Sequence, residues 1–172
     1  MSDIIPLDTV ASDAIEALLD AAFGPDRHGR TAYRIREGMA IIPALSVAIA
    51  GRGGELIGTL QSWPVALTQA DGRQIPLIMI GPVAVAPAHQ QDGHGRAMMD
   101  AVIGKARALR TEPLIMIGDP EYYGRFWGFT AAGTGGWDAP GPFEKRRLLA
   151  LSLDGRPVGG EGMLTPRITI SA

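Results

Sequence analysis

The fold of this chain follows from one segment, Ile80-Gly-Pro-Val-Ala-Val-Ala-Pro-Ala-His-Gln-Gln-Asp-Gly-His-Gly-Arg-Ala-Met-Met-Asp100. An apolar strand leads through Pro87 into a polar turn, and Gly93-His94-Gly95 then opens a helix. The first N–H groups of a helix have no intrahelical acceptor, and the helix dipole makes that end partly positive. With the charge of Arg96 in the first turn, this order predicts a site for phosphate or pyrophosphate.

Hydrophobic periodicity on either side of this segment predicts the remaining elements. We expect helices at 13–23, 33–39, 96–109 and 121–126, and strands at 45–50, 55–67, 75–85, 114–117 and 147–153. The first three strands are joined by turns and form an antiparallel meander, and a strand, helix, strand step follows. The predicted class is α+β (mixed α/β), with a mostly antiparallel twisted sheet flanked by helices.

The composition limits the classes of protein that fit. A chain of 172 residues suits one domain, expected at 1–153, with a tail at 154–172 in which 167–170 is a candidate edge strand. The formal net charge is −2, which argues against a nucleic-acid partner, and the chain has no cysteine. No apolar run approaches the roughly 20 residues of a membrane span, and no secretory signal opens the chain. We therefore expect a cytoplasmic protein without a membrane partner.

Two motifs resemble those of a known family. Gln90-x-x-Gly93-x-Gly95 resembles the acyl-CoA signature Q/R-x-x-G-x-G/A of the GNAT superfamily of N-acetyltransferases. The later segment Gly118-Asp-Pro-Glu-Tyr-Tyr-Gly-Arg-Phe-Trp-Gly-Phe129 resembles the family's Y-x-x-x-G-F ending. It is most similar to a group of small bacterial, mostly uncharacterised acetyltransferases with a G-x-P-x-Y-Y-x-R-F-G-F segment. The resemblance implies a GNAT-like sheet with a splay between its two central strands, which admits the pantetheine arm.

The resemblance also implies a reaction and the residues that carry it. In the implied reaction, an amine attacks the thioester of acetyl-CoA, which is the cosubstrate. The resemblance implies that the N–H of Val83 stabilises the developing oxyanion. It also implies that Tyr123 protonates the leaving thiolate as general acid. The residues expected to bind the cofactor are Val83, Ala84, Val85, Gln90, Gln91, Asp92, Gly93, His94, Gly95, Arg96, Ala97, Tyr122, Tyr123 and Phe126.

The register of the tyrosine needs a decision, because Trp127 is an extra residue relative to that group's pattern. Counting back from Gly128 places Gly124 at the tyrosine position, whereas counting forward from Pro120 places Tyr123 there. We favour Tyr123, since Pro120 fixes the start of the helix and its end can absorb the insertion. Tyr122 is the reserve candidate.

The acceptor is a primary amine of an unknown small molecule or peptide. Contacts to it are expected from the first helix, from the basic segment at 26–43 and from the loop near Trp137. The basic segment weakly favours an acidic or carboxylate-bearing acceptor. Candidates for the general base, by residue type only, are Asp119, Glu121, Glu37 and His28.

Other interpretations stay open. The missing base and the Trp127 insertion are also compatible with a non-catalytic acyl-CoA-binding or sensor module on the same fold. A dinucleotide-binding oxidoreductase fits poorly, because Met98 occupies the third glycine position of the G-x-G-x-x-G pattern. The three histidines show no metal-ligand spacing, so no metal is expected, and His89 and His94 are expected to border phosphate. A homodimer paired through the C-terminal strand is plausible.

Overall fold

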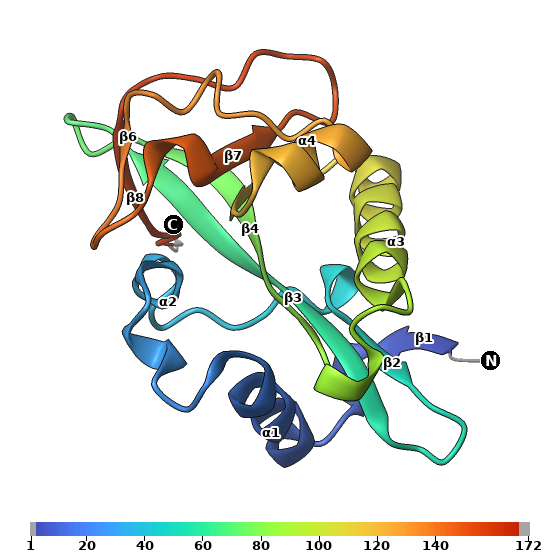
Figure 1. Cartoon of the computed structure of the whole chain (residues 1–172). Helices are drawn as coiled ribbons and strands as arrows, with labels where there is room; N and C mark the ends of the chain where they lie inside the picture. Colours follow the sequence, from blue (N-terminus) through green and yellow to red (C-terminus); the bar gives the residue numbers. More distant parts are fainter. Residues whose placement is uncertain (1–2, 169–172) are drawn as a thin grey trace. The chain divides into compact units, whose positions relative to one another are not determined.

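The computed structural model describes residues 3–168 (Figure 1). Among the helices of that range, none has the length and apolar character needed to cross a membrane. The helices are α1 (Ser12–Phe23), α2 (Thr31–Ile35), α3 (His94–Leu109) and α4 (Pro120–Trp127), with 3₁₀ turns η1 (Leu7–Thr9), η2 (Arg27–Gly29), η3 (Pro43–Leu45), η4 (Pro87–His89) and η5 (Lys145–Arg147). The strands are β1 (Asp3–Pro6), β2 (Val47–Ala50), β3 (Leu56–Thr68), β4 (Gln74–Val85), β5 (Leu114–Ile117), β6 (Trp137–Asp138), β7 (Leu148–Leu151) and β8 (Gly162–Pro166).

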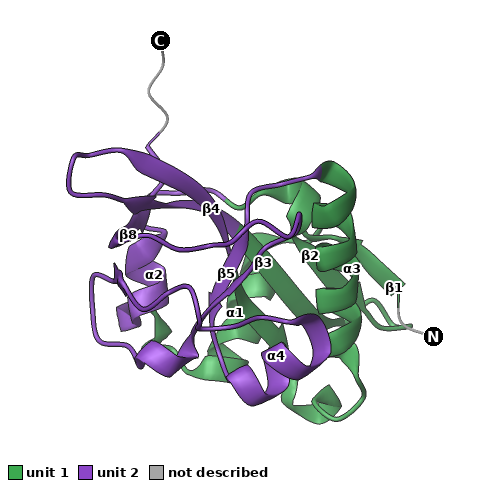
Figure 2. Ribbon diagram, turned by 90° about the horizontal axis from the view of Figure 1, so that it is seen from above, with its two compact units in different colours: residues 1–28, 41–62, 80–109 green, residues 29–40, 63–79, 110–172 purple. Residues whose placement is uncertain are grey.

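The chain divides into two compact units, shown in green and purple in Figure 2. Unit 1 comprises residues 1–28, 41–62 and 80–109, and unit 2 comprises 29–40, 63–79 and 110–172. Strands β3 and β4 are long enough to contribute to both units. The first part of β3 belongs to unit 1 and the first part of β4 to unit 2.

Unit 1 is built on antiparallel pairing of β1 with β2 and of β2 with β3. Helix α1 places its apolar face in a core that also takes residues from η1, β2 and β4; its members are Leu7, Ile15, Leu18, Leu19, Ala48 and Ala84. Helix α3 packs against β2. Gly58 makes room for this helix, because a Cβ there would lie 2.9 Å from Cε of the fully buried Met98.

Unit 2 contains the parallel pairs β4 with β5 and β6 with β8, and the antiparallel pairs β5 with β7 and β3 with β8. Its core is formed by apolar side chains from these strands and from α2, including Ile35, Val65, Leu77, Ile115, Trp137, Leu148 and Leu164. Together with the pairs of unit 1, this pairing confirms the predicted α+β class with a mixed, mostly antiparallel sheet.

Several expected elements need correction. The second helix is α2, which begins at Thr31 and ends at Ile35, where Tyr33–Met39 was expected. Strand β6 lies in the segment 133–142, which had been expected to be a loop. The late edge strand is β8, which ends at Pro166, and Arg167 and Ile168 are not part of it; the last two residues of the expected strand lie outside the described residues.

Candidate functional site

The segment that joins β4 to α3 forms a compact loop within unit 1. Ala86 donates its N–H to the carbonyl of Ile57 at 2.7 Å, which holds the start of the loop against β3. The η4 turn then closes through the N–H of His89 to the carbonyl of Ala86 at 2.8 Å. The amide of Gln90 lies 3.4 Å from the carbonyl of Val85. Hydrogen bonds to β3 and β4 therefore hold the loop that is expected to bind pyrophosphate.

Two glycines leave space at the start of α3. Gly93 has φ +79°, a conformation that other residues rarely adopt, and it turns the chain into the helix. Within the described part of the chain, a Cβ built on Gly93 or Gly95 would meet no atom within 4 Å. A ligand can therefore approach the backbone here, next to N–H groups that a helix leaves without intrahelical acceptors. The following Arg96 and Ala97 occupy the first turn of α3.

The predicted contact residues on β4 differ in their surroundings. Val83 and Val85 are half-buried, whereas the side chain of Ala84 is 1% exposed and belongs to the core of unit 1. The side chain of Ala84 is therefore not available to a ligand. The strand continues through Gly81-Pro82, and the expected splay between the two central strands stays a prediction.

Helix α4 lies in unit 2, and its two ends are defined by Pro120 and Gly128. Pro120 stands in its first turn, and Gly128, with φ +87°, caps its C-terminus in the left-handed conformation. The helix extends through Trp127, so the inserted residue is accommodated within the helix. Gly124 sits where a Cβ would lie 3.0 Å from the carbonyl oxygen of Phe129, and the tyrosines precede it.

Tyr123 and Tyr122 have different environments on this helix. Tyr122 is exposed, with an edge-to-face contact to Phe126 at 5.1 Å. Tyr123 is half-buried, and its ring lies 5.8 Å from Trp127. Burial raises the pKa of the Tyr123 phenol above its usual value of 10.0, and the proximity of Tyr122 and Asp119 adds to this effect. Burial therefore favours the protonated form of the Tyr123 phenol.

An open pocket of about 530 Å³ lies within unit 2. It is lined by the end of β5, the start of α2 and the segment before β7, through Arg30, Thr31, Ala32, Ile117, Pro142, Phe143, Glu144 and Arg147. Thr31 donates its hydroxyl to the carbonyl of Pro142 at 2.6 Å, which ties two of these segments together. Two guanidinium groups and one carboxylate line the pocket, so it favours a ligand that carries a negative group.

Only part of the basic segment faces such a ligand. Arg27 is 1% exposed and is paired with Glu16 and, at 3.4 Å, with Asp20 of α1. Arg36 is also buried, and its guanidinium lies 3.7 Å from the centre of the Trp63 ring. These two arginines stabilise the fold, and Arg30 is the arginine of the segment among the residues that line the pocket.

The loop near Trp137 reaches the pocket through residues that follow the tryptophan. Trp137 itself is 2% exposed and belongs to the core of unit 2. The residues of this region that reach the pocket are Pro142, Phe143 and Glu144. The sequence around these three residues contains no motif that indicates a binding site.

The four candidates for the general base are spread over the chain. Glu121 forms an ion pair with Arg146, and Asp119 lies 3.3 Å from Nε of Arg147. Glu37 and His28 are exposed. Glu144, which no sequence pattern indicated, is the carboxylate among the pocket-lining residues.

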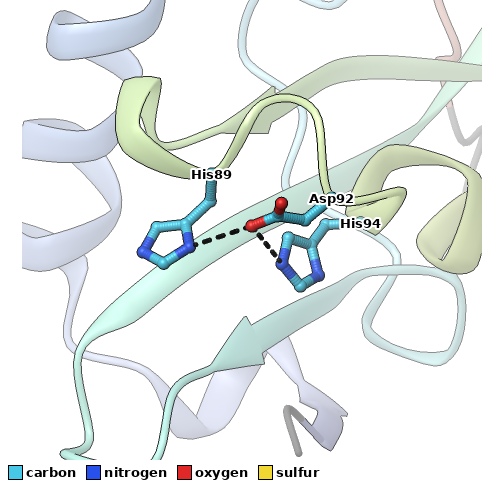
Figure 3. Close-up of side chains that lie close together, drawn as sticks. All are labelled: His89, Asp92 and His94. Atoms are coloured by element: carbon cyan, nitrogen blue, oxygen red, sulfur yellow. Dashed lines mark ion pairs between the residues drawn. The ribbon is translucent and has the colours of Figure 1, made fainter.

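Two of the histidines lie closer together than their spacing suggested. Figure 3 shows His89 and His94 directed toward the carboxylate of Asp92. One potential metal-ligand atom from each of these residues lies within 4.8 Å of the others. His89 and His94, together with Asp92, therefore do have an arrangement that could bind a metal, contrary to the expectation from their spacing.

Comparison with known proteins identifies the family of this chain. The family model of the acetyltransferase (GNAT) domain matches residues 3–131. The chain belongs to the GNAT acetyltransferase family, as the two sequence motifs predicted. A comparison with curated proteins gives no significant match.

Solved structures show the same fold. The GNAT family N-acetyltransferase YhbS of Escherichia coli, in complex with CoA, aligns with a TM-score of 0.69 at 22% identity over 95% of this chain and 88% of its own. A GNAT family acetyltransferase of Brucella melitensis, in complex with acetyl-CoA, aligns with a TM-score of 0.63 at 22% identity over 94% and 93% of the two chains. At this level of identity, the alignments establish the fold.

Proposed function

We propose that this protein transfers an acetyl group from acetyl-CoA to the primary amine of a small molecule or peptide. The observation that carries the proposal is the loop before α3, where open space beside Gly93 and Gly95 adjoins the amides of a helix start. A diphosphate fits this arrangement because it is anionic and accepts several hydrogen bonds. The structures of two GNAT proteins with CoA and acetyl-CoA support the choice of ligand.

The proposed reaction is a direct transfer. The amine nitrogen attacks the thioester carbonyl carbon, and the N–H of Val83 stabilises the negative charge that develops on the carbonyl oxygen. The carbon–sulfur bond then breaks as the amide forms. The Tyr123 hydroxyl donates its proton to the departing thiolate. The Tyr123 phenol, whose pKa is raised above 10.0, is protonated at neutral pH, as a proton donor must be.

The pocket in unit 2 is the proposed site for the acceptor. Arg30 and Arg147 line it, and guanidinium groups bind carboxylates through paired hydrogen bonds. We therefore infer an acceptor that carries a carboxylate in addition to its amine, such as an amino acid or a short peptide. Glu144 lines the same pocket, and we assign to it the uptake of the amine proton, directly or through a water molecule.

Acetyl transfer is tested by measuring CoA release with a thiol reagent across a panel of amines. Since the protein has no cysteine, the reagent reports only free CoA. We expect turnover with carboxylate-bearing amines and slower turnover with their amide derivatives. Binding of acetyl-CoA without turnover of any amine would instead favour the non-catalytic sensor module.

A further inference from the structure

We propose that His89, Asp92 and His94 form a binding site for a divalent transition metal, of which Zn²⁺ fits best. His89 ends η4, Asp92 lies in the turn that follows, and His94 begins α3 (Figure 3). The positive φ of Gly93 turns the chain between Asp92 and His94, which brings the three side chains to one side of the loop. The site lies wholly within unit 1 and needs no acetyl-CoA for its formation.

The distances within this cluster are longer than those of direct hydrogen bonds. Oδ2 of Asp92 lies 3.4 Å from Nδ1 of His89 and 3.8 Å from Nε2 of His94. Ordinary N–H···O hydrogen bonds are about 2.7–3.2 Å long, so neither pair is well bonded directly. Around a tetrahedral zinc with bonds of about 2.0–2.2 Å, neighbouring ligand atoms are about 3.3–3.5 Å apart. Small side-chain rotations would bring all three ligand atoms to such separations.

The ligand types determine which metals fit. Imidazole nitrogen suits zinc, copper, nickel and cobalt, whereas magnesium and calcium require a shell of oxygen ligands. Three protein ligands also leave a fourth tetrahedral position open to water or to another donor. The side chains are accessible from solvent, with exposures of 36% for His89, 57% for Asp92 and 15% for His94, so a metal can enter without unfolding of the loop.

A bound metal would connect three parts of the loop at once. It would join the end of η4, the turn and the first residue of α3, and it would thereby fix the segment to which pyrophosphate binding is assigned under the proposed function. The metal site itself does not depend on that assignment. Titration of the metal alone therefore separates the two proposals, because CoA binding is measured in a different experiment.

The test is calorimetric titration of untagged, chelator-treated protein with Zn²⁺ at pH 7.5, with melting temperatures as a check on folding. We expect one Zn²⁺ per chain, a higher melting temperature on binding, and no binding of Mg²⁺. The variants His89→Ala, Asp92→Asn and His94→Ala should each bind Zn²⁺ at least about tenfold more weakly. His28→Ala is the matched control, because His28 is the third histidine of the chain and is exposed outside the cluster; it should bind like the wild type.

A measurement on the unaltered protein guards against variants that fail to fold. Co²⁺ bound by nitrogen and oxygen ligands in a tetrahedral site gives strong visible absorption, and Zn²⁺ should displace it. The proposal is overturned if the wild type shows no saturable Zn²⁺ binding, if no such absorption develops, or if folded variants at all three positions bind Zn²⁺ as tightly as the wild type.

Discussion

The ring of Tyr123 occupies the space that a side chain on Gly118 would need. A Cβ built on Gly118 would lie 2.7 Å from Cε2 of Tyr123, which is closer than real Cβ contacts allow. The N–H of Gly118 also donates to the carbonyl of Arg147 at 2.9 Å, so the backbone at this point cannot move freely. The absence of a side chain on Gly118, which follows β5, thus leaves room for the ring of the proposed general acid.

Replacement of this glycine tests that relationship. Gly118→Ala should displace the Tyr123 ring, lower kcat and cost about 1–3 kcal/mol of unfolding free energy, the usual penalty of an overpacked site. Gly104→Ala is the matched control, since it lies on the exposed side of α3 and a Cβ there meets no described atom within 4 Å. That change should stabilise the protein by about 0.5–1 kcal/mol and leave kcat unchanged. Equal activities of the two variants would refute the proposed link.

Substitution of each of the two adjacent tyrosines shows which one is the general acid. Tyr123→Phe keeps the ring but removes the proton that the thiolate needs, so kcat should fall by about 10²–10⁴ with a small change in KM. Tyr122→Phe should stay close to the wild type, because that side chain is exposed. Steady-state kinetics of CoA release measures both. The reverse result would move the role to Tyr122.

The raised pKa of Tyr123 predicts a titration at unusually high pH. The folded protein disfavours the phenolate, so this group supports stability below pH 10.0 and that contribution is lost as the pH rises from there through the folded pKa. Ultraviolet absorbance of tyrosinate should show a step above pH 10.0 that belongs to Tyr123. The step should be missing in Tyr123→Phe. Its persistence in that variant would assign it to another tyrosine.

If the acceptor binds in the proposed pocket, substitution of an exposed arginine that lines it should change KM for the acceptor. Arg30→Gln removes one positive charge from the pocket and should raise KM for carboxylate-bearing amines by about two- to fivefold, with less effect on KM for acetyl-CoA. Arg107→Gln serves as the control, because Arg107 is an exposed residue of α3 in the other unit. If both substitutions change KM for the acceptor equally, the pocket is not its site.

The long elements were predictable because their apolar residues repeat with a clear period. Strand β4 ends at Val85 and helix α3 ends at Leu109, both as expected. Strands β1, β6 and β8 were missed or misplaced because they have two to five residues and form through their pairing partners. A strand of two residues such as β6 carries no alternation that a sequence can show.

Some parts of the candidate site were also predictable from the sequence, and others were not. The loop before α3 and the tyrosines of α4 are local motifs, so their spacing alone indicated them. The pocket in unit 2 joins Arg30 with Glu144 and Arg147, which are far apart in the sequence. The pairing of His89 with His94 around Asp92 depends on the turn at Gly93, which motif spacing does not describe.

Calorimetric titration with CoA of the wild type, Gly95→Leu and Gly104→Leu tests the central claim most directly. Both glycines lie on α3, and a Cβ at either position meets no described atom within 4 Å, so both variants should fold. We predict that the wild type and Gly104→Leu bind CoA with similar affinity, while Gly95→Leu binds at least about tenfold more weakly because its side chain fills the space next to the helix amides. Wild-type protein that binds no CoA, or Gly95→Leu that binds as tightly as the wild type, would contradict the account.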